Sequence, residues 1–166
     1  MKLNELFGIK YPFIQGGMAN IATGAFAAAV SNAGALGTIG AGGMNTEQLR
    51  EEIRTCKDKT QNPFAVNLML MNPHADEMAK MLVEEGVKIV TTGAGMPGKY
   101  LPMWKESGMK VFPVTSSVAI AKRLEKATLQ TIEEGYMTGD IARIAEPKAK
   151  DVLDSWEFIS AIRSRL

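Results

Sequence analysis

A repeating unit dominates the first two thirds of the 166-residue chain: a short apolar run, a glycine-bearing turn and a segment of helical character. The apolar runs lie at residues 12–16, 35–39, 64–70, 87–92 and 109–114. Each run is nearly continuous rather than alternating, which is typical of strands buried on both faces of a parallel sheet. The sequence therefore predicts an α/β fold with about five parallel strands and a helix after each strand.

The segments between these runs have the composition and spacing of helices that cover a sheet. Residues 24–34 are rich in Ala, the strongest helix former. Thr46 can cap a helix that carries Leu49 and Ile53 on one face. Right-handed crossovers would bring the C-terminal ends of the strands to one rim, which is where parallel barrels and open sheets bind ligands.

The repeat stops near residue 128. Residues 128–136 and 154–166 both have helical character, so we expect a partial (β/α) barrel over residues 1–127 and a helical tail over residues 128–166. A complete eight-unit barrel needs about 250 residues. The first part is therefore predicted to be a TIM barrel truncated to about five strands, either a half-barrel or an open, flavodoxin-like sheet with helices on both faces.

The composition argues against several classes of function. Lys and Arg number 19 against 18 Asp and Glu, and without a basic block the chain is not expected to bind nucleic acid. The single cysteine, Cys56, permits no disulfide framework, and no group of residues has metal-ligand spacing. No run of 18 apolar residues predicts a membrane span, and the first residues do not have the pattern of a leader. These features predict a cytoplasmic protein.

Small residues and one amide mark the predicted strand ends. They are Gly16, Gly17 and Met18, the glycines of residues 40–43, Asn67, and residues 93–95. Glycine allows backbone N–H groups to approach a flat or anionic ligand, and a buried amide needs hydrogen-bond partners. Glycine is also common in ordinary turns, and neighbouring loops could equally satisfy Asn67 or the similar Gln15. Their shared place on one rim is what favours a ligand.

No catalytic residue can be named from the sequence. His74, the only histidine, follows Pro73 near the predicted start of a helix, where a solvated loop residue is more common than a catalyst. No combination of Ser, His and an acid and no carboxylate pair stands out among the predicted strand ends.

Five segments resemble, in order and spacing, the front half of the FMN-dependent enoyl-acyl carrier protein reductase II family. They read YPFIQGGMA, AGALGTIG, NPFAVNLML, GVKIVTTGAG and VFPVTSSVAIAKRLEK, within residues 1–127. The resemblance implies a TIM barrel that binds FMN at its C-terminal mouth and passes hydride from NAD(P)H to a 2-enoyl thioester. It also implies that Gly17, Met18 and Asn67 contact the flavin and that Gly93 and Ala94 line the mouth. Nitronate monooxygenases share this front half and are the closest alternative activity.

The same resemblance implies features that the sequence lacks. The family continues with a strand and an AGGH-type motif that carries its catalytic histidine, and then with glycine-rich and GTRF-type segments that hold the FMN phosphate. These motifs are absent here, and His74 does not match the family's histidine. Residues 128–166 instead resemble the C-terminal tail of NADP-dependent isocitrate dehydrogenases, in ATLQTIEEGYMTGDIARI and SWEFISAIRSRL. Two resemblances in one chain indicate a fusion, an engineered chimera or a rearranged gene, joined near residues 126–128.

Two hypotheses of function follow. In the first, the chain is an FMN-dependent oxidoreductase for a small-molecule or acyl-carrier-bound substrate, and its barrel mouth is completed by self-association or by a partner fragment. In the second, it is a non-catalytic half-barrel whose exposed sheet is covered by the terminal helices or paired in a homo-oligomer. Under either hypothesis, an unclosed parallel sheet has edge strands with unpaired backbone groups, which favour association with another chain.

Overall fold

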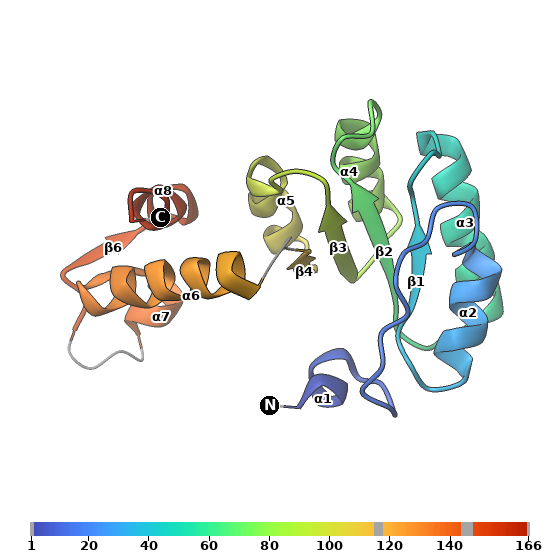
Figure 1. Ribbon diagram of the computed structural model, residues 1–166, viewed down its shortest axis with the longest axis horizontal. Coiled ribbons are helices and arrows are strands. Elements are labelled where there is room, and N and C mark those ends of the chain that lie inside the picture. Colours follow the sequence, from blue (N-terminus) through green and yellow to red (C-terminus); the bar gives the residue numbers. More distant parts are fainter. Residues whose placement is uncertain (1, 115–117, 144–147, 166) are drawn as a thin grey trace. The chain divides into compact units, whose positions relative to one another are not determined.

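The computed structural model describes residues 2–114, 118–143 and 148–165, and divides the chain into two compact units (Figure 1). The first unit comprises Met1–Val114 and the second Thr115–Leu166. The candidate site lies wholly in the first unit.

The first unit is built on a four-stranded parallel sheet in the order β1-β2-β3-β4. Its strands are β1 (Gly37–Gly40), β2 (Phe64–Met69), β3 (Ile89–Gly93) and β4 (Lys110–Pro113). The helices are α1 (Leu3–Phe7), α2 (Gly24–Asn32), α3 (Thr46–Lys59), α4 (Ala75–Glu84), the 3-10 helix η1 (Gly98–Tyr100) and α5 (Leu101–Glu106). The alternation of strand and helix confirms the predicted α/β class.

Helix starts follow local capping chemistry. The Thr23 hydroxyl accepts a hydrogen bond from the Phe26 N–H at 3.2 Å and so caps α2. Asn45 and Gln48 form a reciprocal capping box at α3, with both bonds at 2.9 Å. The cap of α3 is therefore Asn45, one residue earlier than the predicted Thr46.

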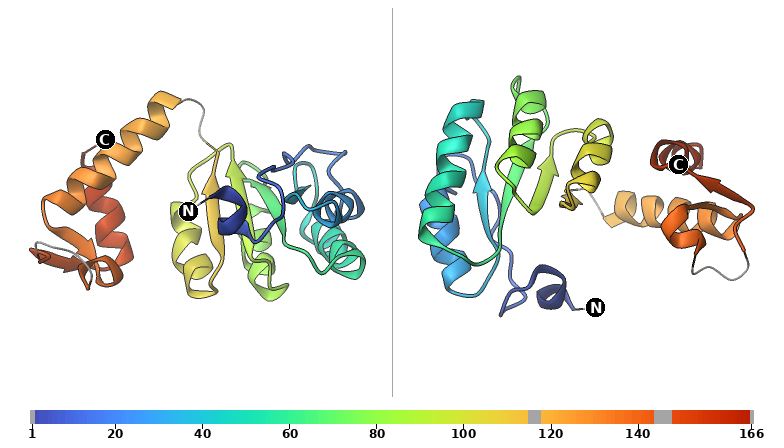
Figure 2. Two further views of the ribbon diagram at one scale, coloured as in Figure 1. Left: turned by 90° about the horizontal axis from the view of Figure 1, so that it is seen from below. Right: turned by 180° about the vertical axis from the view of Figure 1, so that it is seen from behind.

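Helices α2 to α5 all pack on one face of the sheet, which we call the outer face (Figure 2). The outer core joins Ile39, Val66 and Val90 of the strands to buried residues of these helices, among them Leu49 and Trp104. A flavodoxin-like sheet would carry helices on both faces. The one-sided arrangement is that of a barrel wall, so the half-barrel alternative describes this chain.

The opposite, inner face has a second and smaller core near the N-terminal ends of the strands. Phe7 of α1 packs there with Leu36, Ala65 and Ile89, and its ring centroid lies 4.7 Å from that of Phe112. Helix α1 therefore closes the N-terminal end of the inner face. The C-terminal half of this face is left for the candidate site.

The run predicted as the first strand, residues 12–16, forms a single β-bridge between Ile14 and Leu36 and no named strand. The sheet consequently has four strands instead of the expected five. The next main-chain rung is missing because the N–H of Thr38 bonds the side-chain Oε1 of Gln15, at 2.9 Å. The glycines that follow then take the chain away from the sheet.

The second unit combines helices with a short parallel strand pair, which the sequence did not predict. Its elements are α6 (Val118–Glu133), β5 (Tyr136–Thr138), α7 (Gly139–Ala142), β6 (Asp151–Leu153) and α8 (Ser155–Arg163). Ala127, Met137 and Ile162 are buried in this unit. Helix α6 runs across the predicted boundary at residues 127/128 because residues 118–133 contain no Gly or Pro. The predicted cap at Ser116 or Ser117 lies outside the described residues.

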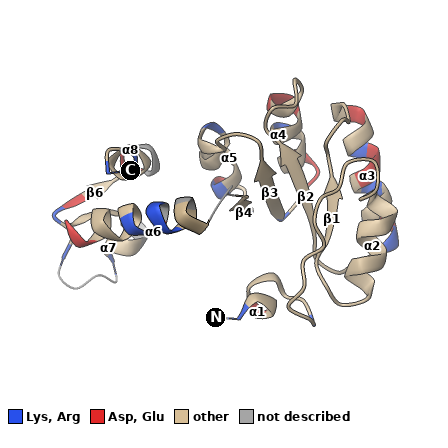
Figure 3. Cartoon of the chain, in the orientation of Figure 1, with Lys and Arg blue, Asp and Glu red and all other residues tan. Residues whose placement is uncertain are grey.

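Charged side chains lie mainly on the helices, and strands β1 to β3 carry none (Figure 3). Within the described ranges, no helix combines the length and the apolar character needed to cross a bilayer.

Candidate functional site

One row of four residues crosses the inner face at the C-terminal half of the sheet. The strand register aligns Gly40 with Asn67, Asn67 with Thr91, and Thr91 with Phe112. Asn67 and Thr91 are tied together, because the amide Nδ2 of Asn67 donates to the Thr91 hydroxyl at 2.8 Å. Side chains in one row of a parallel sheet share a face, so the row presents a polar pair between a glycine and an aromatic ring.

The loop of residues 16–18 lies directly on this row. A methyl group at Gly17 would come within 2.3 Å of Cβ of Asn67, and one at Gly40 within 2.8 Å of the Met18 carbonyl oxygen. Both contacts are shorter than the 3.0 Å that real Cβ atoms keep, so glycine is required at both positions for the loop to approach the sheet. The fold thus brings together Gly17, Met18 and Asn67, three residues that the sequence singled out.

The turn after β3 forms the neighbouring part of the rim. Gly93 aligns with Met69, two residues beyond Asn67 on β2, and its carbonyl accepts the Leu70 N–H at 2.9 Å. Ala94 follows with φ of 53°, a left-handed conformation that is uncommon for a residue with a side chain. Ala94 therefore turns the chain sharply at the C-terminal end of β3.

Two glycines of the predicted set face open space. A Cβ at Gly16 or Gly93 would meet nothing within 4 Å, and neither residue has a positive φ. The packing of the described residues therefore does not itself require glycine there. A bound molecule that occupies this space would explain why both positions are glycine.

The surface around the row is apolar. Met18 and Met69 are 42% and 37% exposed, and Val114, just after β4, is 65% exposed. Side chains of Met adapt their shape to a partner surface. The arrangement suits a flat and largely apolar group placed against the Asn67 and Thr91 pair.

Lys99 of η1, which follows the turn after β3, is engaged by a carboxylate. Its Nζ lies 2.6 Å from Oδ1 of Asp76, to which the Tyr100 hydroxyl also donates at 2.5 Å. These bonds from Lys99 and Tyr100 lower the pKa of Asp76. The cluster anchors η1 to α4, and its positive charge is compensated locally.

Neither of the two other reactive side chains belongs to the site. His74 is the N-cap residue of α4, is 46% exposed at its side chain, and lies 3.6 Å from Glu77, as expected for a solvated residue. Cys56 is buried in the outer core, where desolvation and then the nearby Glu52 raise its pKa to about 11. Among the residues that the structure describes, no three ligating side chains are grouped for a metal ion.

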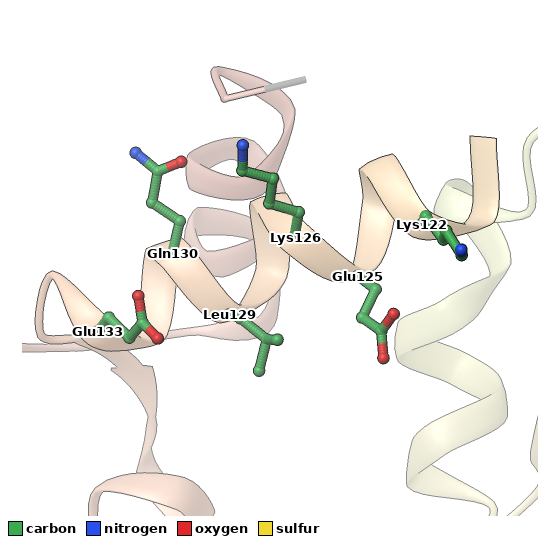
Figure 4. A pocket seen from close by; sticks show the side chains of 6 residues that line it. All are labelled: Lys122, Glu125, Lys126, Leu129, Gln130 and Glu133. Carbon is green, nitrogen blue, oxygen red and sulfur yellow. The ribbon is translucent and has the colours of Figure 1, made fainter. Parts of the chain in front are cut away.

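Two surface hollows are lined by residues outside the row. One is a shallow depression whose lining comes from α6 alone (Figure 4). Its lining residues are Lys122, Glu125, Lys126, Leu129, Gln130 and Glu133. The other is at the N-terminal ends of the strands, where Phe64, Ile89 and Lys110 contribute to it. Ligand sites of parallel α/β folds occupy the C-terminal ends, so neither hollow is a candidate.

Sequence reasoning missed Thr91. Thr91 carries a signal of the same kind as Asn67, since it is a polar residue inside an apolar strand run. What the sequence could not give was the register that places both residues in one row. Gly40 was noticed as part of a glycine turn, but its contact with Met18 depends on the path of the loop.

The family model for nitronate monooxygenase matches residues 1–153. The chain belongs to the nitronate monooxygenase family. Within it, the chain is 48% identical over 69 residues to a probable nitronate monooxygenase of Staphylococcus aureus, across 42% of this chain and 19% of that protein. It is 30% identical over 148 residues to a (3aS,4S,5R,7aS)-5-hydroxy-7a-methyl-1-oxo-octahydro-1H-indene-4-carboxyl-CoA dehydrogenase of Mycobacterium tuberculosis, across 84% of this chain and 41% of that protein.

A solved structure agrees with this assignment. FabK from Thermotoga maritima superposes with a TM-score of 0.70 at 45% identity, over 75% of this chain and 40% of the FabK chain. The chain therefore spans less than half the length of these family members. These matches do not show the predicted likeness of residues 128–166 to isocitrate dehydrogenases, and the nitronate monooxygenase model extends into that region.

Proposed function

We propose that the chain forms the flavin-ring wall of an FMN-dependent oxidoreductase of the enoyl-acyl carrier protein reductase II type. The observation that carries the proposal is the contact of Gly17 with Asn67 at the C-terminal ends of the strands. Family membership and the likeness to FabK support the same cofactor. The proposed ring-binding residues are Gly16, Gly17, Met18, Asn67, Gly93 and Ala94.

The residues present fit the ring of FMN. The space beside Gly16 and Gly93 is open, so a planar group can approach the backbone there. The Thr91 hydroxyl accepts a hydrogen bond from the Asn67 amide, which fixes the plane of that amide. The same bond therefore also fixes the direction of the amide carbonyl oxygen. An amide held in this way can pair with the alternating donors and acceptors at the pyrimidine edge of a flavin.

The row itself offers no charged partner for the phosphate of FMN. Strands β1 to β3 carry no charge, and Lys99 is already paired with Asp76. Charge-assisted bonds supply much of the affinity for a phosphate group. We therefore propose that this chain recognises the ring and that a partner fragment which completes the mouth binds the phosphate.

Bound FMN would supply hydride transfer between NAD(P)H and a small-molecule or acyl-carrier-bound substrate. The protein residues would act by orientation. The backbone of Gly17 and Met18 would hold one edge of the ring, and Asn67 would fix its rotation on the inner face. Met18 and Met69 would exclude water from the ring by covering it with apolar surface.

A comparison of two ligands tests whether this chain binds the flavin ring without binding the phosphate. Riboflavin and FMN share the ring and differ by the phosphate, so we expect dissociation constants for this chain that agree within about threefold. Flavin fluorescence quenching during titration measures both. Gly17→Ala and Asn67→Leu should each weaken both ligands by about tenfold or more. Matched controls are Gly98→Ala, where a methyl group meets open space, and Gln61→Leu, an exposed amide at the opposite end of β2.

Two results would contradict the proposal. The proposed binding of the flavin ring is wrong if neither riboflavin nor FMN binds at 100 µM protein, a concentration high enough to detect weak binding of ligands of this size. The proposal that this chain does not bind the phosphate is wrong if FMN binds at least 100-fold more tightly than riboflavin.

Nitronate monooxygenase is the second candidate activity, favoured by the family model and by the relative from Staphylococcus aureus. The two activities differ in their oxidant. A reductase consumes NAD(P)H in the presence of a 2-enoyl thioester, whereas a nitronate monooxygenase consumes oxygen with a nitronate and needs no nicotinamide. Parallel measurements of NAD(P)H absorbance and dissolved oxygen with FMN-loaded protein distinguish them.

A further inference from the structure

The main-chain ladder between residues 13–15 and β1 contains one substituted rung. The Leu36 N–H bonds the Phe13 carbonyl and the Gln15 N–H bonds the Leu36 carbonyl, both at 2.9 Å, as in a parallel pair. The next rung should join the Thr38 N–H to the Gln15 carbonyl. Instead, the Thr38 N–H bonds the side-chain Oε1 of Gln15, also at 2.9 Å.

This substitution frees the main chain from the sheet one residue early. The side-chain amide of Gln15 satisfies the Thr38 donor, so the Gln15 carbonyl is not needed on the ladder. The Nε2 group of the same amide donates to the Gly16 carbonyl. One side chain therefore holds the edge of β1 and the first peptide of the loop together.

The loop that leaves in this way is the one that reaches the row. Gly17 comes against Asn67, and the Met18 main chain lies over Gly40. A regular strand would have continued along β1 and kept these residues at the sheet edge. The departure at Gln15 is therefore the step that directs the loop onto the inner face.

We propose that Gln15 is a positioning residue that holds the loop of residues 16–18 over Asn67 through this substituted rung. Its consequence for ligand binding rests on the proposed flavin function. Gln15 does not itself have to touch the ring. It sets where the Gly17 and Met18 backbone lies, and that backbone in turn meets the ligand.

Two substitutions separate the bond that Gln15 accepts from Thr38 from the bond that it donates to Gly16. Glutamate at position 15 keeps an acceptor for Thr38 but loses the donor to Gly16, and it places a negative charge beside the Gly16 carbonyl. Leucine has a similar size and loses both bonds. A mere packing role for Gln15 would be served by leucine and would leave the Thr38 amide unaffected.

Amide hydrogen exchange at Thr38 and riboflavin titration together test the proposal. Gln15→Leu should speed Thr38 exchange and weaken riboflavin, each by about five- to tenfold, as expected for the loss of one hydrogen bond. Gln15→Glu should leave Thr38 protected and still weaken riboflavin by a similar factor. Gln61→Leu and Gln61→Glu are the matched controls and should change neither quantity.

The outcomes separate this proposal from the proposed function. Unchanged Thr38 exchange in Gln15→Leu, with a folded protein by circular dichroism, overturns the substituted rung. Faster exchange with unchanged riboflavin affinity overturns the positioning role. If the unsubstituted chain binds no flavin, the flavin function fails. The loop role is then decided by the Gly17 amide chemical shift, which must move in Gln15→Glu.

Discussion

At the scale of single residues, two neighbouring threonines on β3 have opposite environments. Thr91 points to the inner face, where its hydroxyl accepts the Asn67 amide at 2.8 Å. Thr92 points to the outer core, is 1% exposed, and has a buried hydroxyl without a partner among the described residues. A buried polar group without a hydrogen bond lowers stability. The same residue type therefore serves the site at position 91 and costs stability at position 92.

Substitution of each threonine by valine separates these effects. Thr92→Val should raise the free energy of unfolding by about 1 kcal/mol, because a methyl group replaces an unsatisfied hydroxyl of the same shape. Thr91→Val should weaken riboflavin several-fold, since Asn67 loses the bond that fixes its amide. Urea denaturation and flavin titration of both variants provide the measurements. A stabilised Thr91→Val variant with unchanged affinity would contradict the role of Thr91.

At the scale of elements, a charged cluster joins α3 to the end of α4. The Glu85 carboxylate is 10% exposed and lies 3.0 Å from Arg50, 2.8 Å from Arg54 and 3.6 Å from Lys57. Burial by itself raises the pKa of Glu85, but the hydrogen bonds from Arg54 and Arg50 outweigh it, and the net pKa is below its ordinary value of 4.5. The cluster therefore stabilises the folded state while Glu85 is ionised.

Removal of this charge should make stability less sensitive to acid. Because the folded-state pKa is lowered, the stabilisation is fully present above about pH 5 and is lost as the pH falls through the folded-state pKa. Glu85→Gln should lower the free energy of unfolding by about 1–2 kcal/mol at pH 7, between the effects of exposed and buried ion pairs. The difference should shrink below about pH 4. Thermal melts from pH 3 to pH 7 test this.

The adjacent Glu84 supplies the matched control for that series. Its carboxylate is 61% exposed and contacts Arg50 at 3.1 Å. Glu84→Gln should therefore change stability by less than about 0.5 kcal/mol at every pH. Equal effects of the two substitutions would show that burial of Glu85 has no energetic consequence.

At the scale of the whole molecule, β4 is an edge of the four-stranded sheet. The Lys110 N–H donates to the carbonyl of Lys88, just before β3, at 2.8 Å, and the Val114 N–H donates to Thr92 of β3 at 2.7 Å. The alternate residues Val111 and Pro113 therefore direct their main chain away from β3. Pro113 has no N–H to donate, and proline on an edge strand limits pairing with another chain. Val111 supplies the N–H group within β4 that faces the open side.

Restoring the missing donor should strengthen association through this edge. Pro113→Val adds an N–H group that faces the open side, so we expect a larger fraction of dimer in sedimentation velocity at the same protein concentration. Pro102→Ala, a proline in α5 and off the sheet edge, is the control and should leave the distribution unchanged. If Pro113→Val also leaves the distribution unchanged, completion of the barrel through the β4 edge is wrong.

Local sequence determined strands β1 to β4 and helices α2 to α5 of the first unit. Apolar runs and glycine turns located β1 to β4, because hydrophobic periodicity and turn chemistry act within a few residues. The same reasoning placed a strand at residues 12–16 and missed β5 and β6. Strands of three residues are too short to show a period, and a side-chain bond between Gln15 and Thr38 leaves no mark in local composition.

The amino-acid sequence alone was enough to predict the family, the α/β class and the proximity of Gly17 and Met18 to the end of β2. The tertiary structure decided that the helices cover a single face and that Gly40, Asn67, Thr91 and Phe112 form one row. It also decided that the loop at Gly17 lies on that row. These features depend on strand register and on contacts between distant segments, which follow from the packing of the whole unit rather than from the preferences of any one segment.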